Sequence, residues 1–130
     1  MIRNTEEDIW AEDLPDGCPP PDAAQPNNEN YFRLVDNLPP TDLDFRSTRQ
    51  EFPNRQLNDE CLARSISLTR SQDSCEQLKR FPYLKRKMII QFSLPPTSGV
   101  VKKTGRNVKD HWSWWRLKNY DIVSIIKNVI

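Results

Sequence analysis

The chain has 130 residues and a net charge of +1, with 36% hydrophobic and 28% charged residues and eleven prolines against three glycines. This size and composition predict one globular domain with an irregular segment. No window approaches the roughly 18 unbroken apolar residues that cross a bilayer, and the first residues lack the basic and apolar regions of a secretory signal, so neither a membrane-spanning nor a secreted protein is expected.

The net charge conceals a gradient along the chain. Residues 1–30 carry eight acidic side chains and one basic, whereas residues 76–130 carry three acidic and twelve basic. Either the acidic front folds over the basic back, or the basic end meets an anionic partner, or both are solvated faces without a partner.

Residues 1–29 are expected to form an extended, acidic, proline-rich arm, because five prolines lie between Pro15 and Pro26. Residues 6–10 fit one helical turn that lays Trp10 onto the folded body. The single folded domain is then residues 30–130.

The first half of this domain alternates short strands and helical turns. Residues 31–35 are aromatic and β-branched, which predicts a strand. Thr41 and Asp44 resemble the start of a short helix that ends near Arg46 and packs Leu43 or Phe45 inward. Residues 47–56 show no period and are expected to be a loop, and residues 58–63 fit one helical turn.

The second half begins with a strand at residues 65–69, where polar and apolar residues alternate. Ser71 resembles a helix N-cap, and Cys75, Leu78 and Phe81 would share one face of a helix that Pro82 ends. Residues 87–94 predict a central strand, residues 95–99 and 104–107 turns, and residues 100–101 and 108–117 further strands. Residues 122–130 fit a helix or a strand, and β-branching favours the strand. These elements predict an α+β fold: a mostly antiparallel twisted sheet with one or two short helices.

Residues 110–116 hold the only histidine and three of the four tryptophans. In a strand, alternate residues share a face, which gives two sets: His111, Ser113 and Trp115, and Trp112, Trp114 and Arg116. In one interpretation the indoles form the core and His111 makes a buried hydrogen bond. In the other, His111 is a general base or hydrogen-bond donor in a cleft where Trp112 or Trp115 stacks a planar ring.

Other common chemistries lack their motifs. One histidine and no C-x-x-C or H-x-x-x-H pair argue against a metal site. Three isolated glycines form neither a P-loop nor a dinucleotide fingerprint. The cysteines Cys18, Cys61 and Cys75 are odd in number and widely spaced, which predicts free thiols, no disulfide framework and a cytoplasmic location.

A basic patch is expected in two stretches of the chain. Its members are Arg80, Lys85, Arg86, Lys87, Lys102, Lys103 and Arg106. The first stretch interleaves aromatic and cationic residues, a composition that binds single-stranded nucleic acid through phosphate contacts and base stacking. The alternative is a solvated edge whose lysines discourage strand pairing.

Two family resemblances rest on particular residues. Arg33 on the first strand and Ser65 and Ser67 on a later strand resemble the Arg and Ser-Thr-Ser elements of ADP-ribosyltransferase-fold proteins. The resemblance implies that Arg33 contacts dinucleotide phosphates, that Ser65 or Ser67 supports a nicotinamide pocket, and that Tyr83 or Trp112 stacks the ring. The family's late catalytic glutamate has no counterpart after Glu76. Residues 31–35, 37–45 and 111–115 also resemble a family of short bacterial proteins without an established function.

Two functions therefore remain open. The first is a small interaction module that binds a protein or nucleic-acid partner through a charge-polarised surface, without a cofactor. The alternative is a toxin-type transferase that binds an NAD-like nucleotide in a cleft around Arg33, Ser67 and His111.

Overall fold

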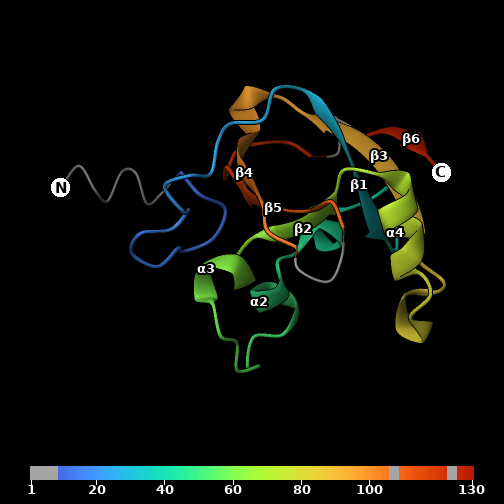
Figure 1. Cartoon of the computed structure of the whole chain (residues 1–130), viewed down its shortest axis with the longest axis horizontal. Coiled ribbons are helices and arrows are strands. Elements are labelled where there is room, and N and C mark those ends of the chain that lie inside the picture. Colours follow the sequence, from blue (N-terminus) through green and yellow to red (C-terminus); the bar gives the residue numbers. More distant parts are fainter. Residues whose placement is uncertain (1–8, 106–108, 123–125) are drawn as a thin grey trace.

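The computed structural model describes residues 9–105, 109–122 and 126–130. Within them, six strands form one sheet in the order β4-β5-β2-β1-β3-β6, and every neighbouring pair is antiparallel (Figure 1). The strands are β1 (Glu29–Val35), β2 (Ile66–Thr69), β3 (Met88–Leu94), β4 (Gly99–Lys103), β5 (His111–Arg116) and β6 (Ile126–Val129). Each strand expected from the sequence has a counterpart among these six, and β3 lies inside the sheet as predicted.

Short helices accompany the sheet, which makes the fold α+β as expected. The described residues hold three α-helices rather than one or two: α2 (Thr48–Glu51), α3 (Glu60–Ala63) and α4 (Gln72–Leu78). Three 3-10 turns lie between strands: η1 (Asp42–Phe45), η2 (Pro82–Leu84) and η3 (Pro96–Ser98). No helix in the described part of the chain is both long and apolar enough to cross a membrane.

The main core lies on one face of the sheet. Tyr31 and Phe92 face each other across β1 and β3, and Trp114 of β5 packs in the same cluster. All three are at most 1% exposed. Gly99 begins β4 where the strand passes so close to the Trp115 carbonyl that a Cβ would collide with it.

Side-chain caps start the helical turns where the sequence predicts them. The Thr41 hydroxyl accepts a hydrogen bond from the Leu43 amide, and the Ser71 hydroxyl accepts one from the Ser74 amide. Phe45 is the residue of η1 that turns inward, since it is 2% exposed and Leu43 is 66% exposed.

Two predicted elements are wrong. The expected loop at residues 47–56 contains α2, because Ser47 and Gln50 form a reciprocal capping box that pairs the first amides of the helix. The helix that begins after Ser71 ends at Leu78, and residues 79–81 continue as tighter turns. Phe81 therefore leaves the helical face and is 52% exposed.

Some predictions fall partly outside the described residues. These are the helical turn at residues 6–10, the turn at residues 104–107 and the beginning of the last strand at residues 122–130. The described end of the chain is β6, which pairs with β3.

Residues 9–28 lie along the β4 and β5 side of the sheet (Figure 1). Trp10 pairs with Leu117, and Ala24 pairs with Val101. Asp22 is 3.1 Å from the Lys102 ammonium. The described part of the acidic segment therefore contacts the domain that follows it.

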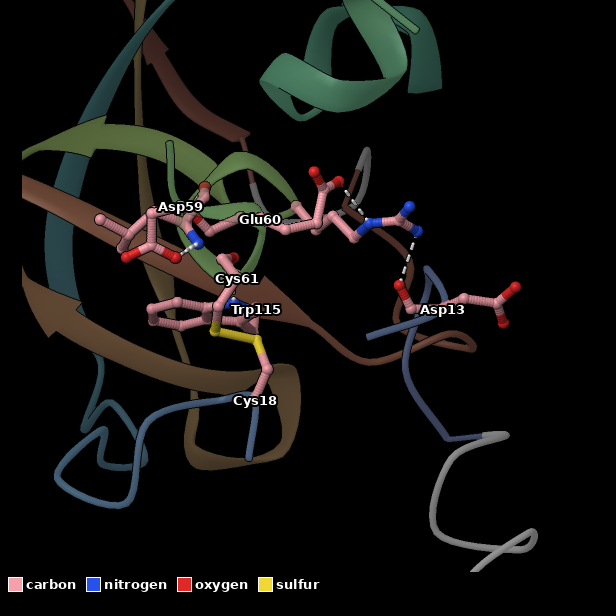
Figure 2. Close-up of a disulfide and its surroundings, with 9 residues drawn as sticks. Asp13, Cys18, Asp59, Glu60, Cys61 and Trp115 are labelled. Atoms are coloured by element: carbon pink, nitrogen blue, oxygen red, sulfur yellow. Dashed lines mark hydrogen bonds and ion pairs between the residues drawn. A yellow bond between two sulfur atoms is a disulfide. The ribbon is translucent and has the colours of Figure 1, made fainter. Parts of the chain in front are cut away.

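The prediction of free cysteines is wrong for two of the three. Cys18 and Cys61 form a disulfide that joins residues 9–28 to α3, as Figure 2 shows, and Cys75 is free and buried. The two residues are 43 positions apart, but the fold brings their Cα atoms to 5.6 Å. The cysteine count therefore no longer supports a reducing compartment.

Candidate binding cleft

A cleft of about 610 Å³ opens between the sheet and the short helices. Arg33 of β1, Ser67 of β2 and His111 of β5 line it together. Its volume lies within the usual range for small-molecule sites. The structure thus brings together the three residues that the sequence proposed for one cleft.

The Arg33 guanidinium donates to three backbone carbonyls, which come from two segments, η1 with its C-terminal residue and β2. Nε donates to Asp44 at 2.7 Å, Nη1 to Ser67 at 2.6 Å and Nη2 to Arg46 at 3.2 Å. A guanidinium has five N–H groups, so two remain for a ligand.

The Arg33 charge has no carboxylate in contact among the residues that the structure describes. Burial lowers the pKa of Arg33 to about 10, although Glu51 and Asp44 act in the opposite direction. The side chain is therefore still cationic at neutral pH. A half-buried, charged guanidinium without an ion pair favours an anionic ligand.

Arg33 reaches the cleft through the junction of β1 and β2. Along β1 its side chain alternates with Phe32, so it leaves the strand on the same face as Tyr31 and Val35. The only register pair between the two strands is Phe32 with Thr69. Beyond that pair, β1 and β2 are joined by the side chain of Arg33, whose guanidinium donates a hydrogen bond to the Ser67 carbonyl of β2.

His111 lies one strand further across the sheet, since it pairs with Thr69, the β2 residue that also pairs with Phe32 of β1. Its Nδ1 is 3.1 Å from the Thr104 hydroxyl, which is 2.7 Å from the Ser113 hydroxyl. Nε2 makes no hydrogen bond with any described residue. Burial, reinforced by the Arg33 charge, lowers the pKa of His111, so the ring is neutral at neutral pH and is a hydrogen-bonding group.

The other predicted serine has a structural role. Ser65 is 2% exposed, and its hydroxyl donates to the Leu62 carbonyl at the end of α3. Ser67, in contrast, is exposed and lines the cleft.

The two proposed tryptophans lie outside the cleft. Trp115 is 1% exposed and donates its indole N–H to the Cys61 carbonyl at 3.0 Å (Figure 2). Trp112 is half-buried on the other face of β5, and its ring packs edge-on against Tyr31. The aromatic rings that line the cleft are instead Phe32, Phe52 and Tyr83.

Several cleft residues were missed because they belong to α2 and the turn after it. Thr48 and Glu51 come from α2, and Arg55 lies with its guanidinium 3.8 Å from the centroid of the Phe52 ring. The Ser47 and Gln50 spacing is the sequence signal that would have placed this helix.

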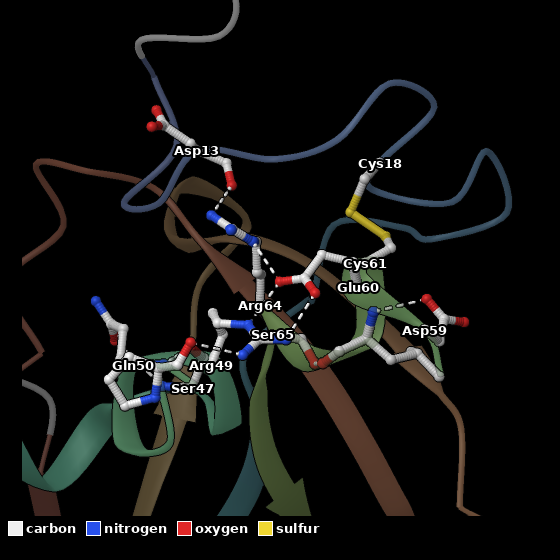
Figure 3. A network of polar contacts seen from close by, with 12 residues as sticks. Asp13, Cys18, Ser47, Arg49, Gln50, Asp59, Glu60, Cys61, Arg64 and Ser65 are labelled. Atoms are coloured by element: carbon white, nitrogen blue, oxygen red, sulfur yellow. Dashed lines mark hydrogen bonds and ion pairs between the residues drawn. A yellow bond between two sulfur atoms is a disulfide. The ribbon is translucent and has the colours of Figure 1, made fainter. Parts of the chain in front are cut away.

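The cleft wall at α2 is supported from behind by an ionic network. Glu60 of α3 accepts two hydrogen bonds from Arg49 of α2, each of 2.8 Å, and one from Arg64 of 2.9 Å (Figure 3). Arg64 also donates to the Asp13 carbonyl. The disulfide is in the same helix as Glu60, so the arm, α3 and α2 form one connected support.

Cysteine chemistry has no activated thiol here. Cys75 lines the cleft, but burial raises the pKa of its thiol to about 11, and Cys61 is in the disulfide. A thiol with this pKa is protonated at neutral pH. The described residues also contain no group of three or more potential metal ligands.

The predicted basic patch is divided between two places. Lys87 pairs with Asp36 at 2.9 Å, and Lys102 pairs with Asp22. Lys103 is exposed on β4, and Arg106 lies outside the described residues. The remaining members, Arg80, Lys85 and Arg86, are exposed and have no ion pair within the described part of the chain.

Comparison with known proteins gives no match to any family model, curated protein or solved structure. Both family resemblances drawn from the sequence therefore stay predictions.

Proposed function

We propose that the protein binds an anionic, ring-bearing ligand of the nucleotide class, such as NAD, in the cleft around Arg33. The observation that carries this proposal is that Arg33, Ser67 and His111, from three strands, line one cleft in which the guanidinium forms no ion pair with any carboxylate of the described residues. Phosphate groups are the common anionic ligands of such an arginine.

The other groups of the cleft fit the remaining parts of a nucleotide. The two unused N–H groups of Arg33 and the exposed Arg55 would hold phosphate oxygens. The rings of Phe52 and Tyr83, which are 37% and 78% exposed, offer stacking surfaces for a base. His111 Nε2 and the Ser67 hydroxyl would bond ribose or amide groups.

The proposal is one of binding rather than of catalysis. His111 has no carboxylate in contact among the described residues, so it lacks the third group that orients a catalytic base. Cys75 is protonated at neutral pH. A transferase activity would need groups beyond these.

Isothermal titration calorimetry with NAD and with ATP tests the proposal. Arg55→Gln and His111→Ala are each expected to weaken binding by about tenfold to a hundredfold, because each removes one bond to a charged or polar ligand group. Ser67→Phe should abolish binding by filling the cleft.

Lys118→Gln is the matched control, because Lys118 is exposed and lies outside the cleft. It should bind both nucleotides as the parent chain does. Binding that survives Ser67→Phe, or that falls equally with Lys118→Gln, would place the nucleotide elsewhere on the surface.

The hypothesis of an interaction module receives support from a different place. The acidic segment and the basic strand β4 partly neutralise each other through Asp22 and Lys102. Four further cations, Lys79, Arg80, Lys85 and Arg86, lie together between α4 and β3 and form no ion pair within the described residues.

A further inference from the structure

The connection between α4 and β3 carries exposed aromatic rings among cations. We call residues 79–86 the cationic aromatic tip; its polar and aromatic members are Lys79, Arg80, Phe81, Tyr83, Lys85 and Arg86. It projects beyond the end of α4 in Figure 1. The backbone there consists of successive tight turns around η2.

Positive side chains dominate the sequence of the tip. Residues 77–109 contain no aspartate or glutamate. Lys79, Arg80, Lys85 and Arg86 make no ion pair within the described residues, in contrast to Lys87, whose ammonium is 2.9 Å from Asp36. A local excess of positive charge attracts polyanions and accelerates their association.

The two rings of the tip lie outside the core. Phe81 is 52% exposed and Tyr83 is 78% exposed, and their centroids are 6.0 Å apart with an interplanar angle of 40°. Each ring therefore keeps much of its surface in water, although adjacent exposed aromatic side chains are unfavourable without a partner. Their positions suit the stacking of successive planar groups.

We infer that the cationic aromatic tip binds single-stranded nucleic acid. Arg80, Lys85 and Arg86 would contact phosphates, and Phe81 and Tyr83 would stack on unpaired bases. Base stacking on aromatic rings, beside cations that follow the backbone, is the usual mode of binding without sequence preference. Inside a duplex the faces of the paired bases are covered by their neighbours, except at the ends. The rings would therefore favour a single strand.

A membrane surface fits the tip less well. Interfacial binding usually uses an amphipathic helix with a continuous apolar face, whereas η2 has three residues. The apolar ring of Phe81 lies between Arg80 and Pro82 in the sequence, and Leu84 is half-buried. The tip therefore offers two separate rings and no continuous apolar face.

This inference goes beyond the nucleotide cleft and does not depend on it. Tyr83 is at the rim of the cleft as well as in the tip, but Phe81, Arg80 and Arg86 do not line the cleft. The failure of one proposal therefore leaves the other intact.

Fluorescence anisotropy of the full chain with a labelled oligodeoxythymidylate of about 12 nucleotides tests the inference. Binding should weaken as salt rises from about 50 to 200 mM. The triple variant Arg80→Gln, Lys85→Gln, Arg86→Gln should reduce the slope of log affinity against log salt by about 2, since single strands release about 0.7 counterion for each contact.

The matched charge control is the triple variant Lys103→Gln, Lys109→Gln, Lys118→Gln, which removes the same charge from exposed positions elsewhere. It should leave the salt slope nearly unchanged. An equal effect of both triple variants would show that only net charge matters, which would overturn a localised site.

The rings are tested separately from the charges. Phe81→Ala, at the ring that does not line the nucleotide cleft, should weaken binding by about tenfold while leaving the salt slope as it is, because stacking releases no counterions. Leu43→Ala, at a 66% exposed apolar residue, is the control and should have no effect. A ring variant that binds the oligonucleotide as well as the parent chain does would overturn the stacking role.

Two competitors distinguish nucleic acid from other anionic partners. Vesicles containing phosphatidylserine and a polyglutamate peptide should each displace the oligonucleotide poorly. Strong binding to the vesicles without binding to the oligonucleotide would assign the tip to membranes. Displacement by polyglutamate that equals displacement by unlabelled oligonucleotide would reduce the tip to a general polyanion surface.

Discussion

Arg33 combines a structural and a ligand-binding role in one side chain. Its guanidinium bonds to carbonyls of Asp44, Arg46 and Ser67, which come from two different segments beside β1. A planar group with several divergent donors can serve three acceptors at once, whereas an ammonium concentrates its donors at one point. The same rigidity leaves two N–H groups in a fixed position for a ligand.

Replacement of Arg33 by lysine is therefore expected to reduce stability. Arg33→Lys should lower the free energy of unfolding by about 1–2 kcal/mol, because the part-buried Asp44 carbonyl and the more exposed carbonyls of Ser67 and Arg46 lose charged donors. Chemical denaturation measures this loss. Arg46→Lys is the control and should cost less than about 0.5 kcal/mol, since Arg46 is exposed. Equal losses in the two variants would mean that the fork geometry of Arg33 contributes nothing.

The pair of short helices α2 and α3 depends on contacts between elements rather than on helix propensity. Each helix has four residues, and isolated helices of that length are unstable in water. Hydrogen bonds from Arg49 and from Arg64 lower the pKa of Glu60 to about 2. The ionised Glu60 carboxylate therefore stabilises the folded pair.

The pH dependence of stability tests this link between the helices. The Glu60 pKa is depressed in the folded state from 4.5, so its contribution is present above pH 4.5 and is lost as the pH falls toward 2. At pH 7, Glu60→Gln should have a lower thermal midpoint than the parent chain. At pH 3, the difference between the two thermal midpoints should be smaller. Glu76→Gln, which removes an exposed carboxylate from α4, is the control. A constant difference between Glu60→Gln and the parent chain across this range would exclude the carboxylate as the source.

The elements that could be predicted are those fixed by local chemistry. Alternation in residues 65–69 and the apolar run of residues 87–94 define β2 and β3 without long-range information, and Thr41 and Ser71 act as caps through neighbouring amides. The sequence did not show where α4 ends, because Phe81 continues the apolar spacing of the helix although residues 79–81 form tighter turns. The positions of Trp112 and Trp115 relative to the cleft depend on which face of the sheet is covered, which one strand does not reveal.

At the scale of the whole molecule, the acidic segment is attached to the sheet by pairing, charge and a covalent bond. Trp10 and Ala24 extend the backbone pairing, Asp22 pairs with Lys102, and Cys18 is bonded to Cys61. None of these partners is near in sequence, so the odd cysteine count gave a misleading prediction of free thiols. The convergence of Arg33, Ser67 and His111 likewise required the strand order, although each residue could be selected from its strand.

A count of reactive thiols tests the attachment of residues 9–28 to α3. Native protein should show no rapidly reacting thiol because Cys75 is buried, and denatured, unreduced protein should show one of the three cysteines. Reduction followed by denaturation should expose all three.

The disulfide closes a separation of 43 residues, for which the chain-entropy relation gives about 4 kcal/mol. The double variant Cys18→Ser, Cys61→Ser should lose about that amount of its free energy of unfolding. Cys75→Ala should keep the disulfide and should migrate in a non-reducing gel as the parent chain does. Three thiols in denatured protein prepared under oxidising conditions would show that the arm is held by its noncovalent contacts alone.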